Sequence, residues 1–281
     1  MLRTRLIVGA ILIALTAGML AFDLRFAPWY PFLFGVVALL GLMGGVELVS
    51  LLSATRQPSV PLTLGGISVV LAANWAGLIF GPTVSGGFVA VLFAFAGLVL
   101  VTFLVEMAAF QGPGGAVERI ALTLWVVAYL GILPSFLVNL QLGRGDGLGP
   151  VVLALAIFVP KGCDIGAYFT GRLIGRHHMT RVLSLKKTWE GAIGGLIAAI
   201  LVTFGLDRLG PVIPGGATGI VLFGLTVGLA GMFGDLAESM VKRDCRRKDA
   251  SQFVPGFGGV LDVVDSIVFA APISYLWLRY N

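Results

Sequence analysis

The sequence predicts an all-α, polytopic integral membrane protein with about nine transmembrane helices. Of its 281 residues, 58% are hydrophobic and only 12% are charged, whereas soluble domains are about one quarter charged. The mean hydropathy is +0.99. Apolar stretches long enough to cross about 30 Å of hydrocarbon recur along the whole chain. The expected spans are 6–22, 30–53, 66–82, 87–109, 120–142, 149–171, 190–209, 216–235 and 262–279.

The first span could be read as a signal peptide, because it follows Arg3 and Arg5. Its exit, Ala21-Phe22-Asp23, is a poor cleavage site of the small-x-small kind, and further spans follow. We therefore expect a retained helix.

The distribution of positive charge predicts the orientation of the spans. With the N-terminus in the cytoplasm, 14 of the 19 Lys and Arg residues fall in cytoplasmic segments and four fall outside. This asymmetry is typical of membrane proteins. The net charge of +5 then favours contact with anionic lipid and phosphate, and we expect no nucleic-acid partner. The predicted location is the bacterial inner membrane, with the active site facing the cytoplasm.

The two halves of the chain differ in their content of ionisable residues. Residues 1–145 are predicted to be scaffold helices, with Glu47 and Glu106 interpreted as carboxylates near the membrane interface. Residues 146–281 are predicted to be the catalytic region, with cytoplasmic loops 172–189 and 236–261. Cys163 and Cys245 lie far apart and form no disulfide framework or zinc motif, so we expect two unpaired thiols.

Lys161 and Asp164 lie three residues apart in the sixth span and therefore share a helix face. Ionisable groups at this depth are costly and usually face a partner or a wet cavity. They are either functional groups or a structural ion pair. A transporter that uses them as an ion relay is the alternative function from a different class.

A short polar loop leads into the seventh span through Ser184, Lys186, Lys187 and Thr188. Cations beside a helix N-terminus bind phosphate well. Ordinary cytoplasmic charge with Thr188 as an N-cap explains the same residues, and the spacing does not separate the two interpretations.

The strongest pattern joins the eighth and ninth spans. Asp235 lies at the cytoplasmic end of one, and Asp262 and Asp265 share a face at the start of the other. Carboxylates at two adjoining helix ends can hold Mg²⁺, which prefers oxygen ligands and substrate phosphates. Basic side chains and a glycine-rich turn at 255–259 lie between them and could bind phosphate. The alternative is a solvated basic loop balanced by acids.

This half of the chain resembles the phosphatidate cytidylyltransferase family, also called CDP-diacylglycerol synthase. The family's S-x-x-K-R and K-D-x-S signature is similar to residues 239–251, SMVKRDCRRKDAS, and its upstream G-D-L-x-E-S to residues 234–239, GDLAES. Its P-G-H-G-G and D-R-x-D motifs are similar to residues 255–259, PGFGG, and 262–265, DVVD. Two further motifs are similar to DIGAYFTGR at 164–172 and SLKKTWEG at 184–191. The resemblance covers about 160–270.

Two positions depart from the signature: Phe257 stands where the family has His, and Val263 where it has Arg. Loss of the His removes a possible proton carrier or hydrogen-bond donor. Loss of the Arg removes a hydrogen-bond donor to phosphate. Either other groups substitute for the two residues, or activity is reduced or redirected. A catalytically inactive lipid-binding scaffold is a third alternative, which these two positions alone suggest. Because Asp235, Asp262 and Asp265 are all present, we retain the enzyme interpretation.

The resemblance implies transfer of the cytidylyl group of CTP to phosphatidate, assisted by Mg²⁺ at the bilayer surface. Another lipid acceptor for CTP chemistry is the near alternative, and a second cation and a homodimer are left open. The expected metal ligands are Asp235, Asp262 and Asp265, which act in catalysis together with Lys242 and Arg243. The expected substrate-binding residues are Asp164, Ser184, Lys186, Lys187, Thr188, Glu238, Ser239, Lys248, Asp249, Gly256, Gly258 and Gly259.

Overall fold

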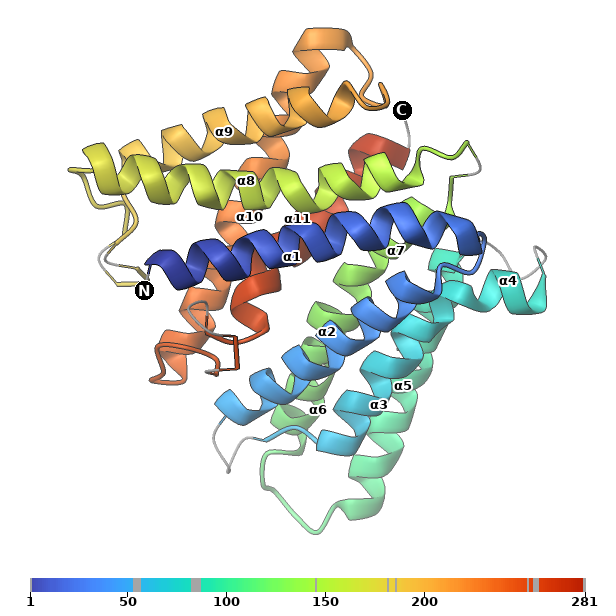
Figure 1. The fold of residues 1–281 in the computed structure, drawn as a ribbon. Helices are drawn as coiled ribbons and strands as arrows, with labels where there is room; N and C mark the ends of the chain where they lie inside the picture. The colour runs from blue at the N-terminus through green and yellow to red at the C-terminus, as the bar shows by residue number, and fades with distance from the viewer. Residues whose placement is uncertain are drawn as a thin grey trace. The chain divides into compact units, whose positions relative to one another are not determined.

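A computed structural model of the chain describes residues 2–52, 57–81, 87–144, 146–180, 182–184, 186–251, 253–254 and 258–279. These residues are mostly helical, and the protein is an all-α polytopic membrane protein (Figure 1). The helices are α1 (Leu2–Asp23), α2 (Pro31–Leu51), α3 (Val60–Ala72), α4 (Ala76–Phe80), α5 (Gly87–Ala109), α6 (Ala116–Val127), α7 (Leu133–Leu142), α8 (Gly149–Ile174), α9 (Trp189–Asp207), α10 (Gly216–Asp244) and α11 (Leu261–Arg279). Short turns η1 (Leu24–Phe26), η2 (Ala73–Trp75) and η3 (Ala128–Ile132) extend or join them.

Within the described ranges, nine helical segments are long and apolar enough to cross a membrane, which confirms the predicted set of spans. Helices α3, η2 and α4 together form the third span, and α6, η3 and α7 form the fifth. The third span begins at Val60, six residues before the predicted start. Pro61 explains the early start, because proline is tolerated in the first helical turn, where its missing N–H is not needed.

The eighth span differs more, because α10 continues nine residues beyond the predicted end at 235. Its added residues, LAESMVKRD, include several good helix formers. Glu238 and Lys242 are also spaced i, i+4, which places their opposite charges together on one helix face. The first part of the predicted loop 236–261 is therefore helical. A prediction based on apolar length alone therefore ends this helix too early.

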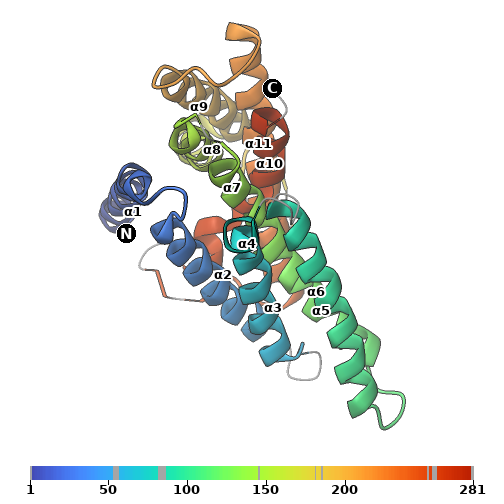
Figure 2. The ribbon, with the colours of Figure 1, turned by 90° about the vertical axis from the view of Figure 1, so that its right-hand side faces the viewer.

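The chain divides into two compact units, and the first comprises residues 1–139 and 249–261. Within it α2 packs on α3, and α5 and α6 pack on α3 and on each other (Figure 2). Buried polar groups satisfy one another: Asn74 donates to Ser135 Oγ at 2.9 Å and accepts from Asn139 at 2.5 Å. The segment 249–261, which the sequence prediction assigned to the C-terminal region, belongs to this unit.

The second unit comprises residues 140–248 and 262–281. Here α8 and α9 run side by side, because small residues line their contact (Figure 1). A Cβ added at Gly166 of α8 would lie only 2.4 Å from Cβ of Ala198 on α9. A Cβ at Gly224 of α10 would lie 2.8 Å from Cα of Ile200 on α9.

Helices α10 and α11 approach equally closely near their polar residues. A Cβ added at Gly234 would meet the carbonyl oxygen of Asp265 at 2.5 Å and Cβ of Phe269 at 2.7 Å. Gly231 packs in the same way against Pro160 of α8 and Ser266 of α11. The glycines of α10 thus bring the residue after Gly234, Asp235, close to Asp265.

Candidate functional site

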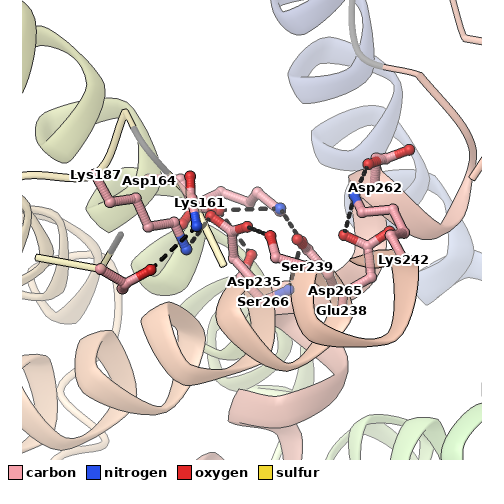
Figure 3. Close-up of polar contacts among 12 residues, drawn as sticks. Lys161, Asp164, Lys187, Asp235, Glu238, Ser239, Lys242, Asp262, Asp265 and Ser266 are labelled. Carbon is pink, nitrogen blue, oxygen red and sulfur yellow. Dashed lines mark hydrogen bonds and ion pairs between the residues drawn. The ribbon is translucent and has the colours of Figure 1, made fainter. Parts of the chain in front are cut away.

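Three carboxylates from two helices meet in the second unit. Asp235 and Glu238 lie on α10 and Asp265 lies on α11, and one oxygen of each lies within 4.8 Å of the others (Figure 3). Asp265 is 4% exposed and Glu238 is 3% exposed, whereas Asp235 is more accessible. Removing like charges this close together from water costs free energy, and the charges also repel one another. The cluster therefore requires compensating positive charge.

Glu238 supplies a second observation that points to a missing partner. Its Oε2 accepts a hydrogen bond from Lys242 at 2.8 Å. Among the residues that the structure describes, its other oxygen, Oε1, is buried without a hydrogen-bond partner. A buried carboxylate oxygen left unsatisfied is unfavourable. An all-oxygen donor set with a free lone pair fits a divalent cation such as Mg²⁺, so these three residues could hold one.

Lysines provide part of the compensating charge. Lys187 Nζ lies 2.8 Å from Asp235 Oδ2. Lys161 Nζ lies between two carboxylates, 3.1 Å from Asp164 Oδ2 and 3.2 Å from Asp265 Oδ1. These contacts confirm the ion-pair interpretation of Lys161 and Asp164 and extend it to Asp265. Together with Lys242, three lysines form ion pairs with five carboxylates of the site (Figure 3).

Ser266 completes the network and was not expected from the sequence. Its hydroxyl donates to Asp164 Oδ2 at 2.7 Å, and its amide donates to Asp265 Oδ1 at 2.6 Å. Both bonds fix carboxylates that also face Lys161. Its position directly after Asp265 was the one available signal, and serine is too common beside helix starts for that to be decisive.

Asp262 takes a different place from the one predicted. The sequence pattern grouped it with Asp235 and Asp265, but its carboxylate pairs with Lys242, and Glu238 joins the other two acids instead. Lys242 is itself buried, with a side chain that is 9% exposed. It therefore links Asp262 on α11 to Glu238 on α10 and is not presented to solvent as a phosphate-binding lysine would be.

The loop before α9 is organised by its own hydrogen bonds. Thr188 is the N-cap of α9, since its hydroxyl accepts from the Gly191 amide at 3.1 Å. This confirms the N-cap interpretation. Glu190 accepts from the amides of Arg176 and His177 at 3.1 and 3.2 Å, which closes the loop onto the helix. Lys186 is exposed and Ser184 is half-buried, while Lys187 is directed at Asp235.

Several predicted residues lie in or just beyond the last turns of α10. Ser239 is within 3.5 Å of Asp235 Oδ1, a weak contact. Arg243, Lys248 and Asp249 are exposed, and Arg243 also donates to the Arg247 carbonyl at 3.2 Å. Burial and the charge of neighbouring Asp244 raise the pKa of the Cys245 thiol, so it is not a reactive thiolate. The exposed cations of this segment remain available to an anionic ligand.

In the glycine-rich turn, a backbone amide that was expected to bind phosphate is hydrogen-bonded to another group of the protein. The Gly258 amide donates to the Val254 carbonyl at 3.0 Å, and the Val254 amide donates back at 2.7 Å. A Cβ at Gly259 would lie 2.5 Å from the Glu47 carboxylate. Gly256 and Phe257 lie outside the described residues. The described part of this turn is therefore engaged in its own packing, which does not favour a phosphate cradle there.

Comparison of the sequence with known proteins identifies the family to which the chain is similar. The model of the cytidylyltransferase family matches residues 3–281. Phosphatidate cytidylyltransferase of Brucella melitensis is 40% identical over 154 residues, which are 54% of this chain and 56% of the relative. The enzyme of that name from Synechocystis sp. is 34% identical over 197 residues, 60% of this chain and 65% of the relative.

A plant relative shows the same similarity. Phosphatidate cytidylyltransferase 5, chloroplastic, of Arabidopsis thaliana is 33% identical over 201 residues, 64% of this chain and 50% of the relative. In each case the chain spans less than two thirds of the relative's length. The family match, in contrast, covers nearly the whole chain. The chain belongs to the cytidylyltransferase family.

Proposed function

We propose that this protein transfers the cytidylyl group of CTP to phosphatidate, giving CDP-diacylglycerol and pyrophosphate. The observation that carries the proposal is the group of Asp235, Glu238 and Asp265, with the buried oxygen of Glu238 lacking a described partner. The names of the relatives supply the nucleotide and the lipid. A site of carboxylates and lysines set among apolar helices fits a substrate with a phosphate head and acyl chains.

Asp235, Glu238 and Asp265 are the residues that we assign to a Mg²⁺ ion. When bound, Mg²⁺ would neutralise phosphate charge and favour departure of pyrophosphate. The five carboxylates and three lysines leave a formal excess of two negative charges, which one divalent ion balances. The ammonium group of Lys161 already occupies the space between Asp164 and Asp265. We therefore assign one divalent ion to the site, with Lys161 in place of a second cation.

The exposed cations are assigned to the phosphates of the substrates. Arg243 and Lys248, in and after the last turn of α10, and Lys186, in the loop before α9, present donors to solvent. Arginine and lysine donors form strong, charge-assisted bonds with phosphate oxygens. Lys242 and Lys187 are assigned to holding carboxylates in place, because both contact acids of the site.

The reaction needs little acid–base chemistry. The phosphate of phosphatidate is already anionic near neutral pH, so one of its oxygens can attack the α-phosphorus of CTP directly. A new P–O bond forms while the bond to pyrophosphate breaks, and pyrophosphate leaves with the electron pair. The barrier is repulsion between anions, and the protein's contribution is positioning and positive charge. This reduces the importance of the family's His, replaced by Phe257.

The proposed location is the bacterial inner membrane, with the N-terminus and the site on the cytoplasmic side. The clustering of Lys and Arg in alternate loops supports this orientation, and two of the relatives above are bacterial. CTP would then reach the site from the cytoplasm while the acyl chains of phosphatidate stay in the bilayer.

The test is a turnover assay on the purified protein in lipid–detergent micelles. CTP is compared with ATP, GTP and UTP, and phosphatidate with a panel of other anionic lipids and polyprenols, at fixed Mg²⁺. We expect release of pyrophosphate that requires both CTP and phosphatidate, with formation of CDP-diacylglycerol. Turnover with a different lipid only would overturn the acceptor, and absence of nucleotide-dependent turnover would overturn the enzyme assignment.

A further inference from the structure

Glu47 is a buried carboxylate in the last turns of α2, far in the chain from the signature motifs. It is 7% exposed and lies in the first unit, which also contains residues 249–261. A lone buried carboxylate is costly unless it is well hydrogen-bonded. Its partners therefore indicate what it is for.

The described partners of the Glu47 side chain come from the segment 251–261, which follows the basic run and ends at the first residue of α11. Oε1 accepts from the Ser251 hydroxyl at 2.6 Å and from the Val260 amide at 2.9 Å. Oε2 accepts from the Leu261 amide at 2.8 Å. Both carboxylate oxygens are thus used, and they join the two ends of the segment 251–261 to one side chain.

The neighbouring glycine shows that the fit is close. A Cβ at Gly259 would lie 2.5 to 2.9 Å from the Glu47 carboxylate atoms, a distance at which something must shift. Glycine at 259 thus makes room for the carboxylate. Ser251, Gly259 and Glu47 form one packed unit.

The same contacts fix the beginning of α11. This helix starts at Leu261, and its first N–H groups have no partner within the helix. Glu47 satisfies the amides of Val260 and Leu261 and places a negative charge at the positive end of the helix dipole. Asp262 follows Leu261 directly, and Asp265 lies one turn further on. The anchor of the helix start therefore sets the register from which both acids project.

We propose that Glu47 is a positioning residue for cytidylyl transfer, which holds the segment 251–261 and the start of α11 so that Asp262 and Asp265 are correctly aimed. This rests on the proposed function for its effect on turnover, and on the contacts alone for its effect on the segment. Small misplacements of reacting groups lower rates by about 100-fold. From the sequence alone we interpreted Glu47 as an interfacial carboxylate, because its partners lie more than 200 residues away in the chain.

Glu47→Gln is the main test. Glutamine keeps the shape but replaces one oxygen by an NH₂ donor, and each oxygen of Glu47 faces at least one backbone N–H, so either amide orientation sets donor against donor. We expect kcat to fall about 10- to 100-fold with a smaller change in KM for CTP. Amide hydrogen exchange at 258–264 should accelerate while exchange in α8 and α9 stays unchanged.

Two further variants keep the test decisive. Ser251→Ala removes the hydrogen bond to Glu47, and with it the longer bond from the Phe253 amide to the Ser251 hydroxyl, without creating a donor conflict. It should therefore fold and lower kcat by about fivefold. Glu106→Gln is the matched control, since Glu106 is also a buried carboxylate of the first unit but pairs with Arg119. It should leave turnover and exchange at 258–264 unchanged.

Unchanged exchange and kcat in Glu47→Gln would overturn the proposal, as would an equal loss in Glu106→Gln. If Glu47→Gln fails to fold, normal kcat and exchange in Ser251→Ala would overturn it. If the unaltered protein shows no turnover with CTP, the proposed function fails, and the exchange measurement still decides whether Glu47 holds the segment.

Discussion

Lys242 places a buried positive charge between two acids on different helices. Its ammonium contacts Glu238 Oε2 at 2.8 Å and also pairs with Asp262. Glu238 is thereby left with one buried oxygen that has no described hydrogen-bond partner, and Asp262 is not part of the group that Glu238 forms with Asp235 and Asp265. Lys242 thus contacts two acids with different assigned roles: Glu238, which could bind metal, and Asp262, which is assigned to orienting Lys242.

This division of roles predicts different Mg²⁺ dependence for two similar variants. Asp235→Asn should raise the Mg²⁺ concentration for half-maximal turnover and lower kcat, because it removes an assigned ligand. Asp262→Asn should lower kcat by about 10- to 100-fold, the usual effect of losing an orienting partner, with little change in Mg²⁺ dependence. A magnesium titration of turnover measures both, and equal Mg²⁺ dependence in the two variants would contradict the assignment.

Asp146 provides the control for these substitutions. It is an exposed aspartate of the second unit whose pKa is held below its usual range by hydrogen bonds from Arg144 and from the Leu148 amide. It is therefore ionised at neutral pH. Asp146→Asn should leave both kcat and Mg²⁺ dependence unchanged.

At the scale of helices, glycine decides how closely the elements of the second unit approach. Gly166 of α8 faces Ala198 of α9, and Gly231 and Gly234 of α10 face α11. In lipid there is no hydrophobic driving force between apolar helices, so close packing of small residues carries much of their association. The carboxylates of α10 and α11 meet because these contacts leave no room for side chains.

Gly166→Ala should therefore destabilise the protein although alanine is the better helix former. The new methyl group would lie 2.4 Å from Cβ of Ala198, which cannot rotate away, and overpacking of this kind costs about 1–3 kcal/mol. The expected result is a lower midpoint of thermal unfolding in detergent.

Gly205→Ala on α9 is the matched control, because no atom outside its local backbone lies within 4 Å of the added Cβ. Its midpoint should stay the same or rise, since alanine favours a helix by up to about 1 kcal/mol over glycine. A larger loss in Gly205→Ala than in Gly166→Ala would contradict the packing argument.

At the scale of the whole chain, the sequence was sufficient to predict the fold class and the set of spans. Hydropathy and length depend only on the composition of a local window, and both criteria agree with the structure over the described residues. The end of α10 was missed because it depends on helix propensity and an i, i+4 ion pair, not on apolar length.

The candidate site was predicted in part, for a related reason. Helical periodicity shows which residues share a face, and it indicated that Asp262 and Asp265 do so. It carries no information about which lysine of another helix reaches which acid. The pairing of Lys242 with Asp262, the approach of Glu238 to Asp265 and the contacts of Glu47 are all tertiary, between residues 20 to 214 positions apart. They could not be read from spacing.

The central claim is that acids of α10 and α11 gather around one divalent ion. Binding of Mn²⁺, used as a paramagnetic substitute for Mg²⁺, can be measured directly by electron paramagnetic resonance on the purified protein without substrates. We predict one bound Mn²⁺ per chain, with affinity reduced about 10-fold or more in Glu238→Gln and unchanged in Asp146→Asn. Two equivalent ions per chain, no bound ion, or unaltered affinity in Glu238→Gln would contradict the claim.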